Sequence, residues 1–133
     1  MTEGTSVPDE LKYSKDHEWI KIEGDLAIVG ITDYAQHSLH EITFVELPEV
    51  GSSVEAHSEC GLVESMKASS DIFSPLSGEI VEVNSSLEDA PELVNEEPYG
   101  KGWMFKIKPS NLDAEIDALM DAKAYSELIA SAE

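Results

Sequence analysis

The sequence predicts a mainly β protein, built as a sandwich of two small antiparallel sheets with a few helices. Two observations support this fold class. Short runs of strand-favouring residues alternate with turn signals along most of the chain. In addition, a weak repeat with the pattern P-x-x-G-x-x-V occurs at 48–54 and again at 75–81. Each copy is typical of a turn that leads into a strand, and two such half-units would form a quasi-symmetric sandwich.

Length and composition indicate one globular domain. A chain of 133 residues is long enough for one core, and a hydrophobic content of 41% is too high for a disordered chain. Residues 1–10 are polar and contain Pro8, so we expect a flexible N-terminal arm and a single domain at 11–133. No apolar run approaches the roughly 20 residues needed to cross a bilayer.

The charge balance narrows the range of partners. Eight Lys and Arg against 28 Asp and Glu give a net charge of −20, which argues against binding nucleic acid or anionic membranes. Such a charge favours a soluble monomer that is attracted to basic patches on other proteins. The N-terminus has neither a secretory signal nor a transit peptide pattern, and the single Cys60 fits a reducing compartment. We therefore expect a cytoplasmic protein in which Cys60 is a half-buried strand residue.

The first third of the chain predicts a hairpin and a short helix. Residues 17–22 and 26–31 favour strands and are separated by a turn at 23–25. Thr32 or Asp33 then caps a helix, with Asp33 and Gln36 spaced as in a capping box. Helical spacing puts three apolar side chains on one face, Ala35, Leu39 and Ile42. A strand at 42–47 follows and is ended by Pro48.

The middle of the chain predicts a second hairpin, with Lys67 at its tip. Strand-favouring residues at 60–63 and 72–73 are joined by a polar segment of small residues that contains one lysine. A lysine at a hairpin tip extends its amine away from the body of the protein, where a modifying enzyme can reach it. From the hairpin alone, an ordinary solvated charge is the more common interpretation.

The last third predicts one more pair of strands and a helical end. A strand at 79–84 puts Val81 and Val83 on one face, and a last strand spans 103–108. We expect the intervening 85–102 to be irregular and held to the body by apolar side chains, Leu87, Leu93 and Val94. Ser110 or Asn111 then caps a helix with an apolar stripe, Leu112, Ile116, Leu119 and Met120, and a second helical piece spans 122–129.

Catalytic and metal-binding patterns are weak. His37 and His40 are three residues apart and share a helix face, but no Cys or carboxylate set at zinc-site spacing accompanies them. We expect two solvent-facing imidazoles and no metal. The sequence also has no glycine-rich phosphate loop, no Cys pair and no Ser-His-Asp arrangement, so we expect a protein that is not an enzyme.

Five segments of the chain, in order, resemble the glycine cleavage system H protein family. They are 13–19, 30–36, 64–71, 74–79 and 95–103, and the likeness extends from about Leu11 to about Leu128. The stretch 64–71, which contains Lys67, resembles the lipoyl-attachment stretch of that family. The resemblance implies the lipoyl/biotinyl type of sandwich, a barrel-sandwich hybrid, with a short helix after the first hairpin and helices at the C-terminus.

The resemblance also implies a function. Lipoic acid would be held in amide linkage on Lys67 and would carry an aminomethyl group between enzymes. The implied partners are a pyridoxal-phosphate glycine decarboxylase (P protein), a tetrahydrofolate-dependent aminomethyltransferase (T protein), a dihydrolipoamide dehydrogenase (L protein) and the lipoyl-attaching enzymes. Tethering the group to one carrier replaces free diffusion by a high effective concentration.

Two acids, Glu18 and Asp71, match positions that the family associates with the loaded arm, so we expect them to protect its positive charge. Two alternatives remain at this point. Met66 before the lysine is also typical of biotin carboxyl carrier domains, although those have Met on both sides and Ala68 follows here. The other alternative is an unmodified interaction protein of the same fold.

Overall fold

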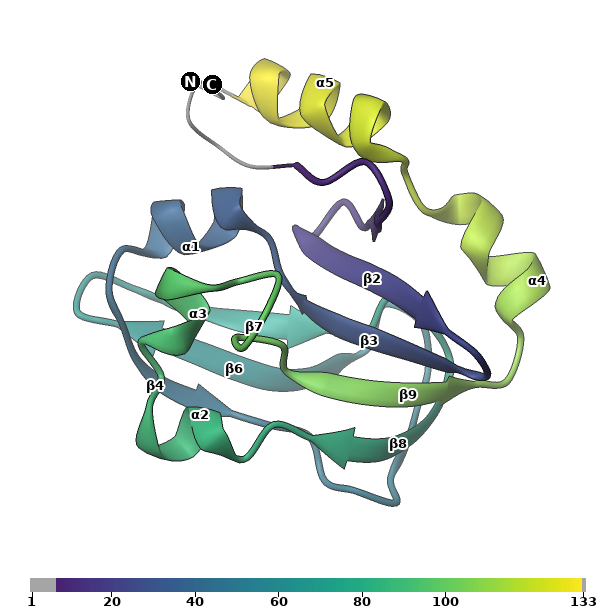
Figure 1. Ribbon diagram of the computed structural model, residues 1–133, viewed down its shortest axis with the longest axis horizontal. Helices are drawn as coiled ribbons and strands as arrows, with labels where there is room; N and C mark the ends of the chain where they lie inside the picture. The colour runs from purple at the N-terminus through teal and green to yellow at the C-terminus, as the bar shows by residue number, and fades with distance from the viewer. Residues whose placement is uncertain (1–6, 133) are drawn as a thin grey trace.

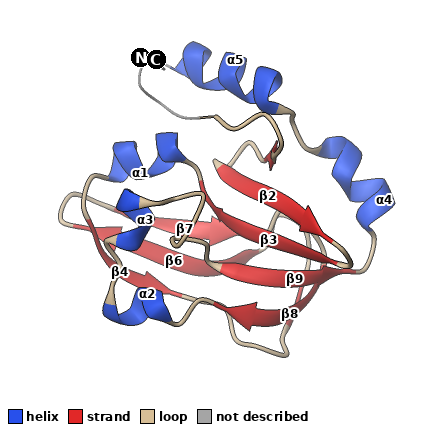
Figure 2. Cartoon of the chain, viewed as in Figure 1, coloured by secondary structure: helices blue, strands red, loops and turns tan. Residues whose placement is uncertain are grey.

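The computed structural model describes residues 7–132, which form two antiparallel sheets and several short helices (Figures 1 and 2). This confirms the predicted mainly β sandwich. In spatial order the larger sheet contains β1 (Lys12–Tyr13), β2 (Glu18–Glu23), β3 (Leu26–Ile31), β9 (Phe105–Pro109), β8 (Gly78–Val83) and β5 (Ser53–Val54). The smaller sheet contains β4 (Ile42–Glu46), β6 (Glu59–Ser65) and β7 (Ser69–Phe73). Most of the expected arm at 1–10 lies outside the described residues.

The main core lies between the two sheets, because alternate strand residues face inward from both. Its members are buried β-branched, aromatic and aliphatic side chains. They include Ala27, Val29, Val45, Val63, Ile72, Ile80, Phe105 and Ile107. Cys60 packs against this core as a partly buried strand residue, as expected. Burial raises the pKa of its thiol to about 12, so the thiolate that would act as a nucleophile is disfavoured.

The helix after the first hairpin is α1 (Asp33–Leu39). Thr32 is its N-cap, and the Thr32 hydroxyl accepts a hydrogen bond from the Ala35 N–H at 3.2 Å. The expected capping box is absent, since the Gln36 amide donates to the Asp33 carboxylate instead. The helix also ends before Ile42, which begins β4. The prediction that Ala35, Leu39 and Ile42 share one helical face is therefore wrong for Ile42.

The two copies of the P-x-x-G-x-x-V repeat lie side by side. Strand β5 comes from the first copy and β8 from the second, and they pair antiparallel with Ser53 opposite Glu79. Gly51 begins this pairing at a φ of 92°, a conformation that glycine adopts without a steric penalty. In β8 the fully buried residue is Ile80, and Val83 packs against the core. The register shifts between Ile80 and Glu82, so the regular alternation assumed in placing Val81 and Val83 on one face is interrupted at Val81.

The segment 85–102 is more ordered than the sequence predicts. It contains two single-turn helices, α2 (Ser86–Asp89) and α3 (Leu93–Glu96). One turn of helix is too short to produce a recognisable period in the sequence. The predicted attachment by apolar side chains is confirmed, because Leu87 and Val94 are fully buried and Leu93 packs against the core.

The C-terminal helix pattern is interrupted. Helix α4 (Leu112–Glu115) passes into a 3₁₀ turn at 116–118, and Met120 then forms an isolated bridge with Tyr13. The prediction of one continuous stripe is therefore wrong. The Glu115 carboxylate accepts hydrogen bonds from the Ser77 N–H and hydroxyl, which fixes this turn to the sandwich.

Helix α5 (Ala122–Ala132) confirms the second helical piece and covers the outer side of the first strands. Tyr125 stacks on Tyr13 with ring centroids 4.7 Å apart, and Ile129 joins the same small core with Trp19. Among residues 7–132, no helix is long and apolar enough to cross a membrane.

Candidate attachment site

Lys67 lies in the connection between β6 and β7, at one extremity of the molecule (Figure 1). The two strands pair from Glu59 opposite Phe73 to Glu64 opposite Ser69, which leaves Met66 and Lys67 at the tip. Both side chains are exposed, Met66 to 88%. The predicted hairpin with an accessible lysine at its tip is therefore confirmed.

Ser65 organises the tip. Its hydroxyl oxygen accepts hydrogen bonds from the backbone N–H groups of Lys67 at 3.2 Å and Ala68 at 3.1 Å. The Ser65 N–H donates to the Ala68 carbonyl at 2.8 Å and closes the turn. Sequence reasoning did not single out Ser65, although a serine two residues before a turn position is a known signal for this contact.

The Lys67 ammonium has one neighbour that the sequence did not reveal. Its Nζ lies 3.3 Å from Nε2 of His40, which follows α1 and is 27 residues away in the chain. His37 and His40 are exposed, as expected for solvent-facing imidazoles. His37 instead approaches the Asp33 carboxylate at 3.5 Å.

A hollow of about 300 Å³ lies beside the hairpin. Strands β6 and β7 contribute Val63, Ser70, Asp71 and Ile72, and α1 contributes side chains such as Tyr34 and Leu39. Asp71 is thus placed at a hollow on the same hairpin as Lys67, four residues further along. This separation corresponds to roughly 13 Å of extended chain at most.

Glu18 occupies a different environment. Its side chain is only 1% exposed, and it does not line the hollow. One carboxylate oxygen accepts a hydrogen bond from the Ser14 hydroxyl at 2.7 Å, and the other accepts from the Phe73 N–H at 3.1 Å. Burial raises the pKa of Glu18 to about 8, although both hydrogen bonds act in the opposite direction. Glu18 therefore links the start of β2 to β7, and its carboxyl holds a proton more readily than an exposed glutamate does.

Comparison with known proteins identifies the family. The family model described as glycine cleavage H-protein matches residues 11–132. The chain belongs to this family. It is 56% identical over 126 residues to the glycine cleavage system H protein of Cronobacter sakazakii, covering 94% of this chain and 97% of that one. The H protein of Carboxydothermus hydrogenoformans is 53% identical over 123 residues, covering 92% and 94%.

A solved structure agrees with the family match. The crystal structure of a glycine cleavage system H protein from Mycobacterium marinum superposes with a TM-score of 0.83 at 41% identity, covering 91% of this chain and 97% of that one. As a member of the H-protein family the chain is a carrier of the glycine cleavage system rather than a catalyst. These matches favour the H-protein interpretation over a biotin carrier or an unmodified interaction protein.

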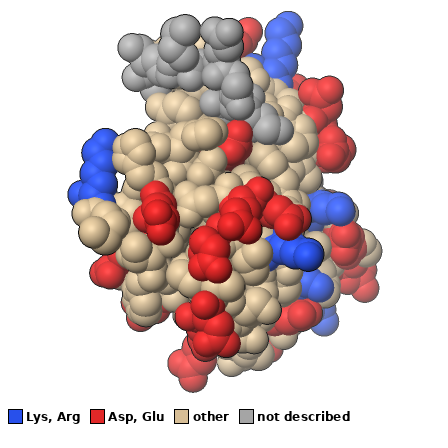
Figure 3. All heavy atoms as spheres, turned by 60° about the vertical axis from the view of Figure 1, so that its left-hand side comes forward, with Lys and Arg blue, Asp and Glu red and all other residues tan. Residues whose placement is uncertain are grey.

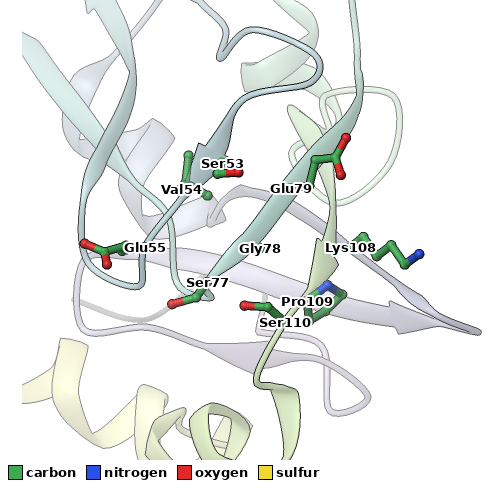
Figure 4. Close-up of a pocket in the computed structure, with 9 residues that line it drawn as sticks. All are labelled: Ser53, Val54, Glu55, Ser77, Gly78, Glu79, Lys108, Pro109 and Ser110. Atoms are coloured by element: carbon green, nitrogen blue, oxygen red, sulfur yellow. The ribbon is translucent and has the colours of Figure 1, made fainter.

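A second hollow of this H-protein family member lies away from the hairpin and lacks converging functional groups. This hollow of about 470 Å³ lies where β5, β8 and the end of β9 meet, and the charged ends of Glu55, Glu79 and Lys108 point away from one another there (Figure 4). Within residues 7–132, no group of three or more His, Cys, Asp or Glu residues is arranged to hold a metal ion.

Acidic side chains dominate the side of the molecule that is brought forward in Figure 3, where Lys and Arg are few. This matches the net charge of −20. Two of the lysines pair with neighbouring acids, Lys21 with Glu23 at 3.2 Å and Lys106 with Glu82 at 3.3 Å. Such exposed pairs contribute little to stability, so the acidic surface remains largely uncompensated.

Proposed function

We propose that Lys67 carries lipoic acid in amide linkage and that this is how the chain serves the glycine cleavage system. The observation that supports the proposal is the exposed Lys67 amine at the tip of a turn that Ser65 holds closed. An attaching enzyme can reach the lysine without opening the hairpin, because β6 and β7 pair with each other up to Glu64 and Ser69, next to the tip. We also propose that residues 11–133 act as a single carrier domain.

The surroundings fit a lipoyl group. The hollow beside the hairpin has an apolar wall from Ile31, Leu39 and Ile72, and Asp71 is among the residues that line it. An apolar wall suits a hydrocarbon chain, while a carboxylate suits a cationic cargo. When attached, the group supplies a disulfide that accepts a one-carbon unit and two electrons. The protein supplies attachment, orientation and protection.

The partners follow from the family. They are the pyridoxal-phosphate glycine decarboxylase, the tetrahydrofolate-dependent aminomethyltransferase, the dihydrolipoamide dehydrogenase and the lipoyl-attaching enzymes. We propose that the chain meets them as a monomer in the cytoplasm, since the relatives named above are bacterial proteins.

Reconstitution tests this function. The three enzymes are mixed with glycine, tetrahydrofolate and NAD, and the chain is added in lipoylated or unlipoylated form. NADH should form only with the lipoylated chain. The proposal would be contradicted if NADH formed with the unlipoylated chain, or if no NADH formed with either form of the chain. A biotinylated lysine in the native protein would favour the biotin carrier class instead.

Asp71→Asn should shorten the lifetime of the aminomethyl-loaded carrier without impairing lipoylation. The carboxylate holds a positive charge that exists only after loading, and a charge-assisted hydrogen bond contributes on the order of 1.5–3 kcal/mol. Loss of cargo should therefore accelerate about tenfold or more. Ammonia release is measured in the absence of aminomethyltransferase.

Two further variants calibrate this result. Glu79→Gln removes an exposed acid near the start of β8 that does not line the hollow beside the hairpin, so it should leave the lifetime unchanged. Glu18→Gln tests the second expected acid. We propose that Glu18 protects the arm through its hydrogen bond to the Phe73 N–H. Glutamine keeps an oxygen that accepts this hydrogen bond, so Glu18→Gln should change the lifetime less than Asp71→Asn. Equal lifetimes in wild type and Asp71→Asn would show that Asp71 is an ordinary surface acid.

Association with the enzymes should slow as salt is added. The net charge of −20 attracts basic patches on partners, and screening reduces this attraction beyond a Debye length of about 10 Å at 0.1 M salt. Stopped-flow association with the decarboxylase should show a rate constant that falls with ionic strength from 0.02 to 0.3 M, roughly tenfold. A rate constant independent of salt would mean that the charge serves solubility alone.

A further inference from the structure

His40 has a backbone conformation that is unusual for a residue with a side chain. Its φ is 66° and its ψ is −151°, a region that is populated almost only by glycine. Only three non-glycine residues among 7–132 have a positive φ, and all are histidines, the other two being His17 and His57. A histidine at this position carries a steric cost that glycine would avoid.

The surrounding contacts hold His40 in this conformation. The Asn95 amide nitrogen donates to the His40 carbonyl at 2.8 Å and to the Gln36 side-chain oxygen at 2.9 Å. The Asn95 oxygen accepts from the Ile42 N–H at 2.8 Å, and the His40 N–H donates to the Gln36 carbonyl at 3.0 Å. One asparagine from α3 thus fixes the backbone on both sides of His40.

The consequence of this arrangement is the position of the imidazole. Its Nε2 lies 3.3 Å from the Lys67 Nζ, although both residues are exposed and belong to separate elements. A strained backbone persists where the surrounding structure over-determines it, and such residues cluster at functional sites. Here the strained residue is the one whose side chain contacts the amine at the hairpin tip.

We propose that His40 accepts a proton from the Lys67 nitrogen when this amine is acylated, and so makes Lys67 a preferred acylation site. The inference rests on the proposed function only in taking Lys67 as the attachment point. The acyl donor belongs to the class of acyl phosphates and acyl adenylates, in which a carbonyl carbon is bonded to a phosphate oxygen. A lysine ammonium must lose two protons to become an amide nitrogen.

The reaction forms one nitrogen–carbon bond and breaks one carbon–oxygen bond. One proton passes from Nζ to Nε2 of His40, and the freed electron pair forms the bond from Nζ to the carbonyl carbon. The bond from that carbon to the phosphate oxygen breaks, and the phosphate leaves with the electron pair and the second proton. His40 then returns its proton to water. Nothing is oxidised or reduced.

The step requires a neutral imidazole, because protonation of His40 removes the lone pair that accepts the proton. The charged and titratable side chains around His40 come from four segments. They are Lys67 at the hairpin tip, His37 on α1, Glu41 before β4, and Glu92 and Glu96 at and within α3. The acylation advantage of Lys67 should therefore fall as the pH is lowered, and a variant without the imidazole should lack this dependence.

The experiment uses the unmodified full chain and acetyl phosphate, without any enzyme. Peptide mass spectrometry follows acetylation of Lys67 relative to two other exposed lysines in the same molecule, Lys101 and Lys123. At pH 7.5, Lys67 should react roughly tenfold faster than either, a modest effect for a proton acceptor at an exposed site. At pH 5.5 this ratio should approach one.

Three variants separate the imidazole from the backbone. His40→Gln keeps a hydrogen-bond acceptor but cannot take a proton, so the ratio should fall to about one at both pH values. His40→Gly removes both the imidazole and the strain, so it should lower the ratio and raise the Tm by about 4 °C. His57→Gly is the matched control, because it relieves a positive φ at an exposed turn and should leave the ratio unchanged.

A ratio near one in the wild type, or an undiminished ratio in His40→Gln, would overturn the inference. The proposed function fails separately. If Lys67 of the native protein is never lipoylated while its acetylation depends on His40, the function falls and the inference stands. If lipoylation occurs on Lys67 but acetylation ignores His40, the inference alone falls.

Discussion

Lys67→Arg should abolish lipoylation while leaving the fold intact. A guanidinium is protonated at any physiological pH and does not form the amide, so no attachment is expected at the tip. The side chain is exposed, and the turn is held by backbone and Ser65 contacts that do not involve the Lys67 side chain. The free energy of unfolding should therefore change by less than about 0.5 kcal/mol. Intact mass after incubation with a lipoyl-attaching enzyme, together with thermal unfolding, checks both expectations.

Lys101→Arg is the matched control. Lys101 is also exposed, so this variant changes one surface lysine in the same way but away from the hairpin. It should be lipoylated as completely as wild type. Lipoylation of Lys67→Arg at another lysine, or loss of its fold, would contradict the assignment of Lys67 as the single attachment point.

Glu18→Gln should stabilise the protein at alkaline pH. Burial raises the pKa of Glu18 from its ordinary 4.5 to about 8. Below pH 4.5 the carboxyl is protonated in both the folded and the unfolded state. Between pH 4.5 and 8 the unfolded state releases the proton first, so the free energy of unfolding falls as the pH rises, and above pH 8 the loss is complete. A neutral glutamine avoids this loss, which amounts to roughly 5 kcal/mol.

The glutamine amide preserves the geometry of the site. Its oxygen replaces the acceptor for the Phe73 N–H, and its nitrogen meets the Ser14 hydroxyl oxygen. At pH 5 the variant and wild type should agree within about 1 kcal/mol. Urea unfolding at pH 5, 7 and 9 measures the difference, and Glu79→Gln controls for the loss of one negative charge. A difference between Glu18→Gln and wild type that does not grow with pH would show that Glu18 is ionised in the folded state.

Local sequence patterns were sufficient for the hairpins. Alternating apolar residues and turn signals predicted β2 with β3, and the small polar segment around Lys67 predicted the tip between β6 and β7. These features depend on residues that are close in the chain, so the sequence displays them directly. The resemblance to a family then gave Lys67 a chemical meaning that the hairpin alone did not.

Features that depend on distant contacts were not predictable in the same way. The strain at His40 follows from Asn95, which is 55 residues away, and the contact between His40 and Lys67 joins two separate elements. The helix at 112–115 ends early because of contacts to Ser77 and Tyr13, although its apolar spacing continues through Met120. Periodicity indicates which residues are apolar, whereas tertiary contacts decide where a helix stops.

The burial of Glu18 is another such case. In the sequence it stands at the start of a strand beside His17, and one acid among 28 Asp and Glu gives no sign of being buried. Its burial arises where β2 meets β7, through Ser14 and Phe73. Sequence reasoning could therefore associate Glu18 with the arm only through the family resemblance, and its role there remains a prediction.

Attachment of lipoic acid to Lys67 is tested most directly by the intact mass of the protein purified from its native cells, followed by peptide mapping of the modified residue. We expect a mass increase of one lipoyl group in amide linkage, located on the peptide that contains Lys67. An unmodified mass in cells that are actively cleaving glycine, a biotin adduct, or a lipoyl group on any other lysine would contradict it.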